Sequence, residues 1–354
     1  MIKIKCALLG GTGIVGQRFV KMLSDHPFFE LSLIIASEKN ENRQYGTAVH
    51  WMIEGDIPSV VKKMKINTFK LNLFEMKGIK VVFSALPPEI AKMWENKLAE
   101  RGCAVFSNSS AHRLDTNVPL LIPEVNPNHI KLVEYQMRKR SGYIVTNPNC
   151  STTGLAIALK PLVKYKIRKV IVSTYQALSG AGYPGVPSLD INSNVIPYIK
   201  DEEDKIENET KKILGILRNN RVINKDILVI PSCTRVPVRE GHLESVVVEF
   251  ADNVSLTNIK EAFETFSSIK NLPTSPLKPI ILRDEEDRPQ PLLDLNAGQP
   301  SRAQGMSVTI GRLKKQQKQL RFFLLVHNTI RGASGNSILN AEYALQKKYL
   351  QKRG

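Results

Sequence analysis

The chain has 354 residues, of which 42% are apolar, so it is long enough for about two domains with cores of their own. No uninterrupted apolar stretch approaches the ~18 residues that a membrane span needs, and we expect no membrane association. The net charge is +17, but the cations are spread along the chain, aromatic residues make up only 6%, and no nucleic-acid-binding signature occurs. We interpret the charge as a solvated basic surface that favours anionic ligands, and we expect no nucleic-acid partner.

The first half of the chain alternates strand and helix patterns. It opens with an apolar run at 2–10 that ends in glycine, which indicates a first strand and not a signal peptide. Residues 15–26 have apolar side chains at helical spacing, and 30–37 form the next strand-like run. The runs at 79–86 and 103–110 end in small polar residues, as parallel strands do before a ligand crevice. These patterns predict an N-terminal Rossmann-like, dinucleotide-binding domain.

A glycine motif follows the first predicted strand. Gly10, Gly13 and Gly16 form a G-x-x-G-x-x-G between that strand and a helix. Glycines at these places permit a tight turn and let a pyrophosphate approach the backbone N–H groups of the helix N-terminus. The motif lies in the first strand–helix unit and the second strand ends at Ser37, so the pattern indicates a dinucleotide site and not a plain glycine turn.

The residues after the second strand bear on which dinucleotide binds. An acidic residue there holds the ribose 2′-hydroxyl of NAD, whereas serine, lysine and arginine suit the 2′-phosphate of NADP. The segment contains Ser37, Glu38 and Lys39, with Arg43 shortly after. Glu38 is ambiguous because a carboxylate facing the ribose would repel a phosphate. The basic neighbours lead us to predict NADP.

The second half is richer in strand patterns, with fewer helices between them. The strand-like runs are 168–176, 227–236, 244–250, 305–313 and 320–328. This arrangement predicts an α+β domain with a mixed or antiparallel sheet, followed by a last helix at 334–350.

One cysteine lies in a setting that favours reactivity. Cys150 directly precedes STTGLAIALKPL, a run with helical spacing that Ser151 or Thr152 could cap. A sulfur there is close to free N–H groups and to the positive end of the helix dipole, which favour the thiolate. The remaining cysteines lie in strand-like runs, far apart and without a C-x-x-C pair: Cys6, Cys103 and Cys233.

This cysteine pattern argues against a metal site or a disulfide framework and favours a reducing compartment, so we expect a cytoplasmic protein. A thiol nucleophile beside a dinucleotide site indicates one chemistry. An acyl group moves to sulfur, and hydride then reduces the thioester to an aldehyde.

Five segments occur in an order and at spacings that resemble a known family: GGTGIVGQRF, NPNCSTTG, QALSGAGYPGVPS, RVPVREGH and HNTIRGASG. They resemble the aspartate-semialdehyde dehydrogenases of the archaeal and fungal-like branch, and the similarity extends over essentially the whole chain. The resemblance implies interconversion of L-aspartyl 4-phosphate and L-aspartate 4-semialdehyde with NADPH, in the route to lysine, threonine and methionine.

The resemblance also implies a catalytic set. Cys150 would be the nucleophile, and Asn149 would orient the acyl oxygen or the nicotinamide. His242 would act as acid and base, with an imidazole near its usual pKa. Gln176 would hold the acyl-enzyme or its water.

Four charged residues are expected to bind substrate by the same resemblance. Arg235 would grip the α-carboxylate with its planar fork, and Glu202 would pair with the α-ammonium. We prefer Glu202 to Glu203 because it is spaced i, i+3 from Lys205. Lys205 and Arg113 would bind phosphate.

The expected cofactor set combines the glycine loop, polar residues at predicted strand ends and two residues of the second half. It consists of Gly10, Thr12, Gly13, Ile14, Val15, Gly16, Ser37, Lys39, Ser84, Ser107, Asn108, Gly182 and Asn328.

The implied organisation is an NADP-binding domain at 1–149 plus 332–354 and a catalytic and dimerisation domain at 150–331. The second domain would bury a sheet between subunits, so we expect a homodimer or homotetramer that acts on small molecules.

Two other functions compete with this interpretation. A malonyl-CoA reductase would share the SGAGYPG segment and the arginine segment, but a CoA thioester does not require the amino-acid and phosphate clamp of Glu202 and Lys205. A non-catalytic nucleotide-sensing or nucleic-acid-binding protein would have no use for a thiol at a helix start together with Arg235 and His242.

Overall fold

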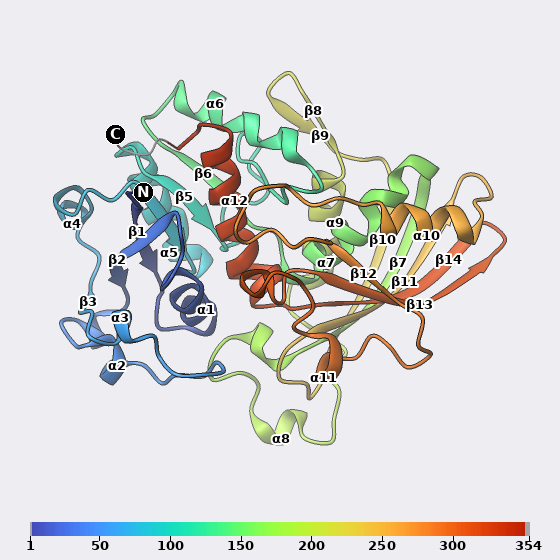
Figure 1. Cartoon of the computed structure of the whole chain (residues 1–354), viewed down its shortest axis with the longest axis horizontal. Helices are drawn as coiled ribbons and strands as arrows, with labels where there is room; N and C mark the ends of the chain where they lie inside the picture. Colours follow the sequence, from blue (N-terminus) through green and yellow to red (C-terminus); the bar gives the residue numbers. More distant parts are fainter. Residues whose placement is uncertain (1, 351–354) are drawn as a thin grey trace. The chain divides into compact units, whose positions relative to one another are not determined.

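The computed structural model describes residues 2–350, and they divide into two compact units (Figure 1). Of the described residues, the first unit contains 2–121, 128–147 and 334–350, and the second contains 122–127 and 148–333. This division differs from the predicted one at 122–127, 148–149 and 332–333. The segment 122–127 joins the second unit through Glu124, whose buried carboxylate accepts two hydrogen bonds from Arg331, at 3.0 and 2.8 Å.

The first unit is built on a six-stranded sheet in the order β3-β2-β1-β4-β5-β6, and all neighbouring pairs are parallel. This is the strand order of a doubly wound dinucleotide-binding domain, so the predicted Rossmann-like fold is confirmed. The strands are β1 (Ile4–Leu9), β2 (Phe29–Ile35), β3 (Ile66–Asn67), β4 (Val81–Ser84), β5 (Ala104–Ser107) and β6 (Tyr143–Thr146). The helices are α1 (Ile14–Leu23), α2 (Tyr45–Ala48), α3 (Ser59–Lys62), α4 (Leu71–Met76), α5 (Pro88–Glu100), α6 (Leu132–Met137) and α12 (Gly335–Gln346).

Sequence pattern explains the central strands of this sheet. Every residue of β4, β5 and β6 is buried, as expected for parallel strands covered on both faces by helices. Both β4 and β5 end in serine, and Ser84 lies opposite Ser107 in the register. Polar residues therefore gather at the carboxyl ends of the strands, where ligands bind in such folds.

The second unit contains a six-stranded sheet in the order β10-β7-β11-β14-β13-β12. The sheet has both parallel and antiparallel pairs, so the predicted mixed sheet is confirmed. Its strands are β7 (Ile167–Gln176), β10 (Leu228–Arg235), β11 (His242–Phe250), β12 (Ile280–Arg283), β13 (Val308–Gln316) and β14 (Gln319–Val326), with a separate hairpin of β8 (Ile216–Arg218) and β9 (Arg221–Ile223). The helices are α7 (Cys150–Leu159), α8 (Ser188–Ile191), α9 (Glu202–Ile213), α10 (Leu256–Glu264) and α11 (Pro291–Asp294).

Burial alternates strictly along β11, so that every second side chain faces a covered side of the sheet. Helices α7 and α9 pack against each other and against strands of this sheet (Figure 1). Among the described residues, no helix is both long and apolar enough to cross a membrane.

Candidate active site

The candidate nucleophile is the first residue of α7. Asn149 caps this helix, and its side-chain oxygen accepts hydrogen bonds from the N–H groups of Ser151, at 3.0 Å, and Thr152, at 3.1 Å. The expectation that Ser151 or Thr152 would cap the helix was therefore wrong, because both residues already lie within its first turn. The cap places Cys150 at the positive end of the helix dipole.

His242, the first residue of β11, lies beside this sulfur. Its Nε2 is 3.1 Å from Sγ of Cys150, and its Nδ1 accepts the backbone N–H of Ala177 at 3.0 Å. An Nδ1 that accepts a hydrogen bond carries no proton, so the neutral ring has its proton on Nε2, directed at the sulfur. Full burial, together with the nearby charge of Arg235, lowers the pKa of His242 to about 3. The expected pKa near the usual value was therefore wrong, because the imidazole has no access to the water that would solvate its charged form.

Arg235 ends β10 on the same face of the sheet. Its register partner on β7 is Gln176, and its Nη1 donates to the Ala177 carbonyl at 2.7 Å. Gly180 packs against the side chains of Arg235 and His242. A Cβ at Gly180 would lie 2.9 Å from Nη1 of Arg235 and 3.1 Å from the His242 ring. The SGAGY segment thus contributes a glycine whose missing side chain makes room for both groups.

Glu202 begins α9 and is buried among hydrogen-bond donors. Its Oε1 accepts from Nδ2 of Asn149 at 2.7 Å and from Nε2 of Gln176 at 3.0 Å. Lys205 lies one turn along, with Nζ 4.0 Å from Oε2 of Glu202. Glu203 instead is exposed and accepts the backbone N–H of Cys233 at 2.9 Å. The structure therefore brings Glu202, and not Glu203, together with Asn149 and Gln176.

Three residues near the nucleophile were not predicted. The Ala177 backbone contacts both His242 and Arg235, and Glu209 accepts the backbone N–H of Asn149 at 2.7 Å. Gly332 approaches so closely that a Cβ there would lie 2.6 Å from the Cβ of Cys150. Residue type and spacing do not predict any of these contacts, since each one involves backbone groups or segments that are distant in the sequence.

The remaining cysteines are structural thiols. Each is buried, and burial raises the pKa of Cys103 to about 11 and that of Cys233 to about 12, while the pKa of Cys6 is raised still further. Cys150 is the one cysteine of the described chain that is not fully buried.

The glycine loop fits a bound pyrophosphate. Gly10 has a φ of +74°, and a Cβ there would lie 2.6 Å from the carbonyl oxygen of Ala85. Gly16 packs on the loop itself, since its Cβ would lie 2.2 Å from the carbonyl oxygen of Gly10. Gly13 is exposed and no side chain caps α1, so the N-terminus of that helix faces solvent over a smooth backbone surface.

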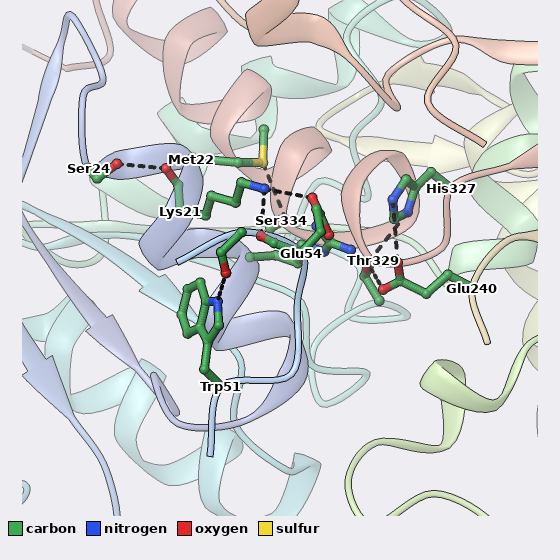
Figure 2. Close-up of polar contacts among 11 residues, drawn as sticks. Lys21, Met22, Ser24, Trp51, Glu54, Glu240, His327, Thr329 and Ser334 are labelled. Carbon is green, nitrogen blue, oxygen red and sulfur yellow. Dashed lines mark hydrogen bonds and ion pairs between the residues drawn. The ribbon is translucent and has the colours of Figure 1, made fainter. Parts of the chain in front are cut away.

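A set of contacts holds the segment around residues 50–55 to α1, the helix that follows the glycine loop. Arg18 donates twice to Glu54, at 2.5 and 2.6 Å, and Lys21 donates to the same carboxylate at 2.7 Å. Figure 2 shows Lys21 directed at Glu54. The Trp51 indole N–H donates to the Gly55 carbonyl at 2.7 Å.

The other expected cofactor residues differ in exposure. Ser37 and Lys39 are exposed at the start of the 3-10 turn that follows β2, whereas the side chains of Ser84 and Ser107 are fully buried. The hydroxyl of Ser107 donates to Glu95 of α5 at 2.7 Å. Both serine side chains are therefore hidden from solvent, and a ligand would meet the backbone of these strand ends.

Two expected cofactor residues belong to the second unit. Gly182 has a φ of +74°, and the space around the position of its Cβ is open. The side-chain amide of Asn328, in contrast, is already hydrogen-bonded within the second unit. It accepts from the Gly241 N–H at 2.9 Å and donates to Ser179 at 2.8 Å. Figure 2 shows the neighbouring residues, where Thr329 donates to Glu240 at 3.3 Å.

The two expected phosphate residues belong to different units. Arg113 is nearly buried in the first unit and donates to the Asn108 carbonyl at 2.8 Å. Lys205 of the second unit is about one-third exposed and contacts the Lys200 carbonyl at 3.5 Å.

Comparison with known families defines the class of the protein. The family model "Semialdehyde dehydrogenase, NAD binding domain" matches residues 5–133, and "Semialdehyde dehydrogenase, dimerisation domain" matches residues 159–331. These matches agree with the parallel sheet of the first unit and the mixed sheet of the second.

Curated relatives narrow the class. An aspartate-semialdehyde dehydrogenase of Archaeoglobus fulgidus is 47% identical over 352 residues, covering 99% of this chain and all of the relative. The crystal structure of the Candida albicans aspartate-semialdehyde dehydrogenase with NADP matches with a TM-score of 0.87 at 34% identity, covering 99% of this chain and all of that one. A malonyl-CoA reductase (NADP) of Metallosphaera sedula is 38% identical over 359 residues, covering 99% of both chains. The chain belongs to the aspartate-semialdehyde dehydrogenase family, and the resemblance inferred from its motifs is confirmed.

Proposed function

We propose that this chain is an aspartate-semialdehyde dehydrogenase that reduces L-aspartyl 4-phosphate to L-aspartate 4-semialdehyde with NADPH, in the route to lysine, threonine and methionine. The observation that carries this proposal is the arrangement around Cys150. A thiol at a helix N-terminus lies 3.1 Å from His242, and the buried Glu202 and Arg235 supply one acidic and one basic group for the two charges of an amino acid.

The thiolate of Cys150 attacks the acyl phosphate, so that an S–C bond forms and phosphate leaves with the electrons of the broken C–O bond. The Nε2–H of His242 donates to the sulfur and then to the oxyanion that develops on the acyl carbon. When bound, NADPH supplies the hydride that reduces the thioester. The tetrahedral oxyanion then collapses, the C–S bond breaks, and the thiolate and aldehyde are released. No step needs an extra proton on His242, which is consistent with a ring that stays neutral.

Recognition of the amino-acid part rests on two buried charges. Arg235 presents a planar fork to the α-carboxylate, and Glu202 accepts from the α-ammonium. Asn149 and Gln176 already donate to Oε1 of Glu202, and these two hydrogen bonds hold the carboxylate in place. Gln176 would also contact the acyl-enzyme.

The first unit is proposed to bind NADP, through the glycine loop for the pyrophosphate and through Ser37 and Lys39 for the 2′-phosphate. The second unit is proposed to be the catalytic domain. Arg113 and Lys205 are proposed to bind the phosphate group of the substrate, as cations that can donate several hydrogen bonds.

A second copy of the chain is the proposed partner of the second unit. The uncovered face of its sheet exposes Ile171 and Tyr175 of β7 beside Leu228 and Ile230 of β10, and Ile171 lies opposite Ile230 in the register. An apolar sheet face within a matched dimerisation domain supports a homodimer, alone or paired as a tetramer. Analytical ultracentrifugation should give at least twice the mass of one chain, and a monomer at micromolar concentration would contradict the proposal. We also propose a cytoplasmic location, which cell fractionation would test.

Malonyl-CoA reduction is the second candidate because of the 38% identical relative. Malonyl-CoA lacks an ammonium group, so it would leave Lys205, 4.0 Å from Oε2, as the cation facing the buried Glu202 carboxylate and would make no use of that carboxylate in recognition. The test compares NADP reduction by aspartate semialdehyde plus phosphate with NADPH oxidation by malonyl-CoA. We expect phosphate-dependent turnover in the first assay. Turnover only with malonyl-CoA would assign the chain to the second function.

A further inference from the structure

A buried polar cluster lies in the first unit, away from the catalytic cysteine. Glu95 of α5 is fully buried, and its Oε1 accepts the hydroxyl of Ser107 at the end of β5. His112, which is 3% exposed, follows in the segment after β5, and its Nδ1 lies 2.7 Å from Oδ2 of Asp115. The cluster therefore places the Glu95 side chain of α5 beside the segment 108–115, which also carries Arg113.

Two atoms of this cluster face each other without a hydrogen bond. Nε2 of His112 and Oε2 of Glu95 are 3.9 Å apart. Both are buried, and neither has a hydrogen-bond partner within the described part of the chain. Buried polar atoms that lack partners are costly, so a pair of them at this separation calls for an explanation.

One proton satisfies both atoms. Nδ1 of His112 donates to the Asp115 carboxylate, which leaves Nε2 as an acceptor when the ring is neutral. A proton on Oε2 of Glu95 would donate to Nε2, and the same proton on Nε2 would donate to Oε2. A closing movement of about 1 Å brings the two atoms to hydrogen-bond distance. Burial raises the pKa of Glu95, with Ser84, Ser107 and His112 acting in the opposite direction, so the cluster retains a proton at higher pH than an exposed glutamate would.

We propose that His112 is a positioning residue for phosphate binding: it bridges Asp115 and Glu95 through one shared proton and so fixes the backbone that carries Arg113. The geometry of the segment fits this role. Arg113 directly follows His112, its N–H bonds to the Ser110 carbonyl at 3.3 Å, and the Asp115 N–H bonds to the His112 carbonyl at 3.2 Å. Hydrogen bonds to the His112 ring therefore limit the movement of the backbone from Ser110 to Asp115.

Several titratable and polar groups of the described residues face the cluster. Glu95 faces the hydroxyls of Ser84 and Ser107 and the His112 ring, and Asp115, which is half-exposed, has Arg140 nearby. Loss of the shared proton would leave a carboxylate against an imidazole lone pair. The bridge then weakens, and Arg113 is held less firmly.

The proposal rests on the proposed function, so the phosphate dependence of the wild type is measured first. A wild type that ignores phosphate would refute the proposed function and, with it, this role for Arg113. Once the wild type is shown to depend on phosphate, the apparent KM for phosphate in semialdehyde oxidation is compared for the wild type, His112→Phe and Glu95→Gln over a range of pH.

His112→Phe keeps the ring volume but removes both hydrogen bonds. We expect it to raise the KM for phosphate about three- to tenfold, with NADP affinity unchanged. Glu95→Gln still accepts from Ser107 and supplies an N–H that does not titrate. It should keep the wild-type KM at the lowest pH measured and, relative to the wild type, lose the rise of KM that follows as pH increases and the shared proton is lost. The KM of each variant is divided by the wild-type KM at the same pH, which removes the effect of the ionisation of phosphate itself.

Glu89→Gln, exposed in the first turn of the same helix, is the matched control and should behave as the wild type. A cluster with only a structural role would lower the melting temperature of the variants and leave the KM for phosphate and its pH dependence unchanged. That result would overturn the proposal. So would a Glu95→Gln variant whose KM at the lowest pH measured rises as much as that of His112→Phe. If His112→Phe does not fold, the pH profile of Glu95→Gln decides alone.

Discussion

His242 presents Nε2 to Sγ of Cys150 at 3.1 Å, while the backbone of Ala177 occupies its Nδ1. With a pKa of about 3, the ring is neutral throughout the working range of an enzyme. We therefore expect the rate of Cys150 alkylation by iodoacetamide to rise with pH in one step, that of the thiol. An additional step near 6.5, the usual pKa of histidine, would contradict a neutral ring.

The donor role of Nε2 predicts the effect of two His242 variants. His242→Ala removes the donor and should lower kcat about 10²- to 10³-fold, as the loss of an oxyanion donor does. His242→Gln places an amide N–H near the same position and should lose less. Steady-state kinetics compares them, and equal losses in both variants would argue for a role that only an imidazole can fill.

Cys150→Ser should abolish nearly all turnover and leave NADP affinity intact, because a hydroxyl is far less ionised than a thiol. Mass spectrometry after one equivalent of iodoacetamide should find the label on Cys150. Cys103 and Cys233 should react later, since burial both shields them and raises their pKa. Cys233→Ser is the control and should be inactivated at the wild-type rate. Full activity with Cys150 completely labelled would exclude the thioester.

Glu202 and Glu203 form a matched pair for testing ammonium recognition. Glu202→Gln removes the buried negative charge and should raise the KM for aspartate semialdehyde about ten- to a hundredfold. Glu203→Gln changes an exposed carboxylate that accepts only the Cys233 N–H, and its KM should change less than about threefold. The reverse order of effects would assign the ammonium to Glu203.

Lys205→Ala should raise the KM for phosphate about ten- to a hundredfold and leave NADP binding unchanged. The control is Lys211→Ala on the same helix, where the lysine is paired with Glu207 at 2.6 Å. Both variants lose one positive charge, so the comparison removes any general effect of net charge. An unchanged phosphate dependence in Lys205→Ala would contradict the proposed phosphate site.

Glu244 is a fully buried glutamate two residues after His242, and neither of its oxygens has a hydrogen-bond partner among the described residues. Burial, with the nearby charge of Glu202, holds its pKa well above the usual 4.5. The folded protein therefore keeps this proton where the unfolded chain has released it. The stability that follows is fully present below 4.5 and is lost as pH rises toward the folded pKa.

Glu244→Gln cannot titrate, so it escapes this loss. The free energy of unfolding of the variant minus that of the wild type should be larger at pH 8 than at pH 5, as measured by urea denaturation. Glu261→Gln, an exposed residue of α10, should show no such difference. A variant whose stability parallels the wild type at both pH values would mean that Glu244 is ionised in the folded protein.

The Rossmann-like class of the first unit followed from the sequence alone, because parallel strands buried on both faces appear as apolar runs and the glycine motif marks the turn between β1 and α1. The short strands β3 and β6 are absent from the predicted elements. The two residues of β3 carry too little pattern to separate a strand from a loop.

The sequence also indicated the candidate nucleophile and the family, since a cysteine at a predicted helix start and five motifs in order are properties of the chain itself. Only the tertiary structure decided the state of the groups around that cysteine. The His242 tautomer depends on the backbone of Ala177, 65 residues away, and its low pKa depends on complete burial beside Arg235. The hydrogen bonds of Glu202 likewise depend on which distant donors packing brings near. Protonation is set by solvent exposure and by neighbours in space, and neither can be read from residue order.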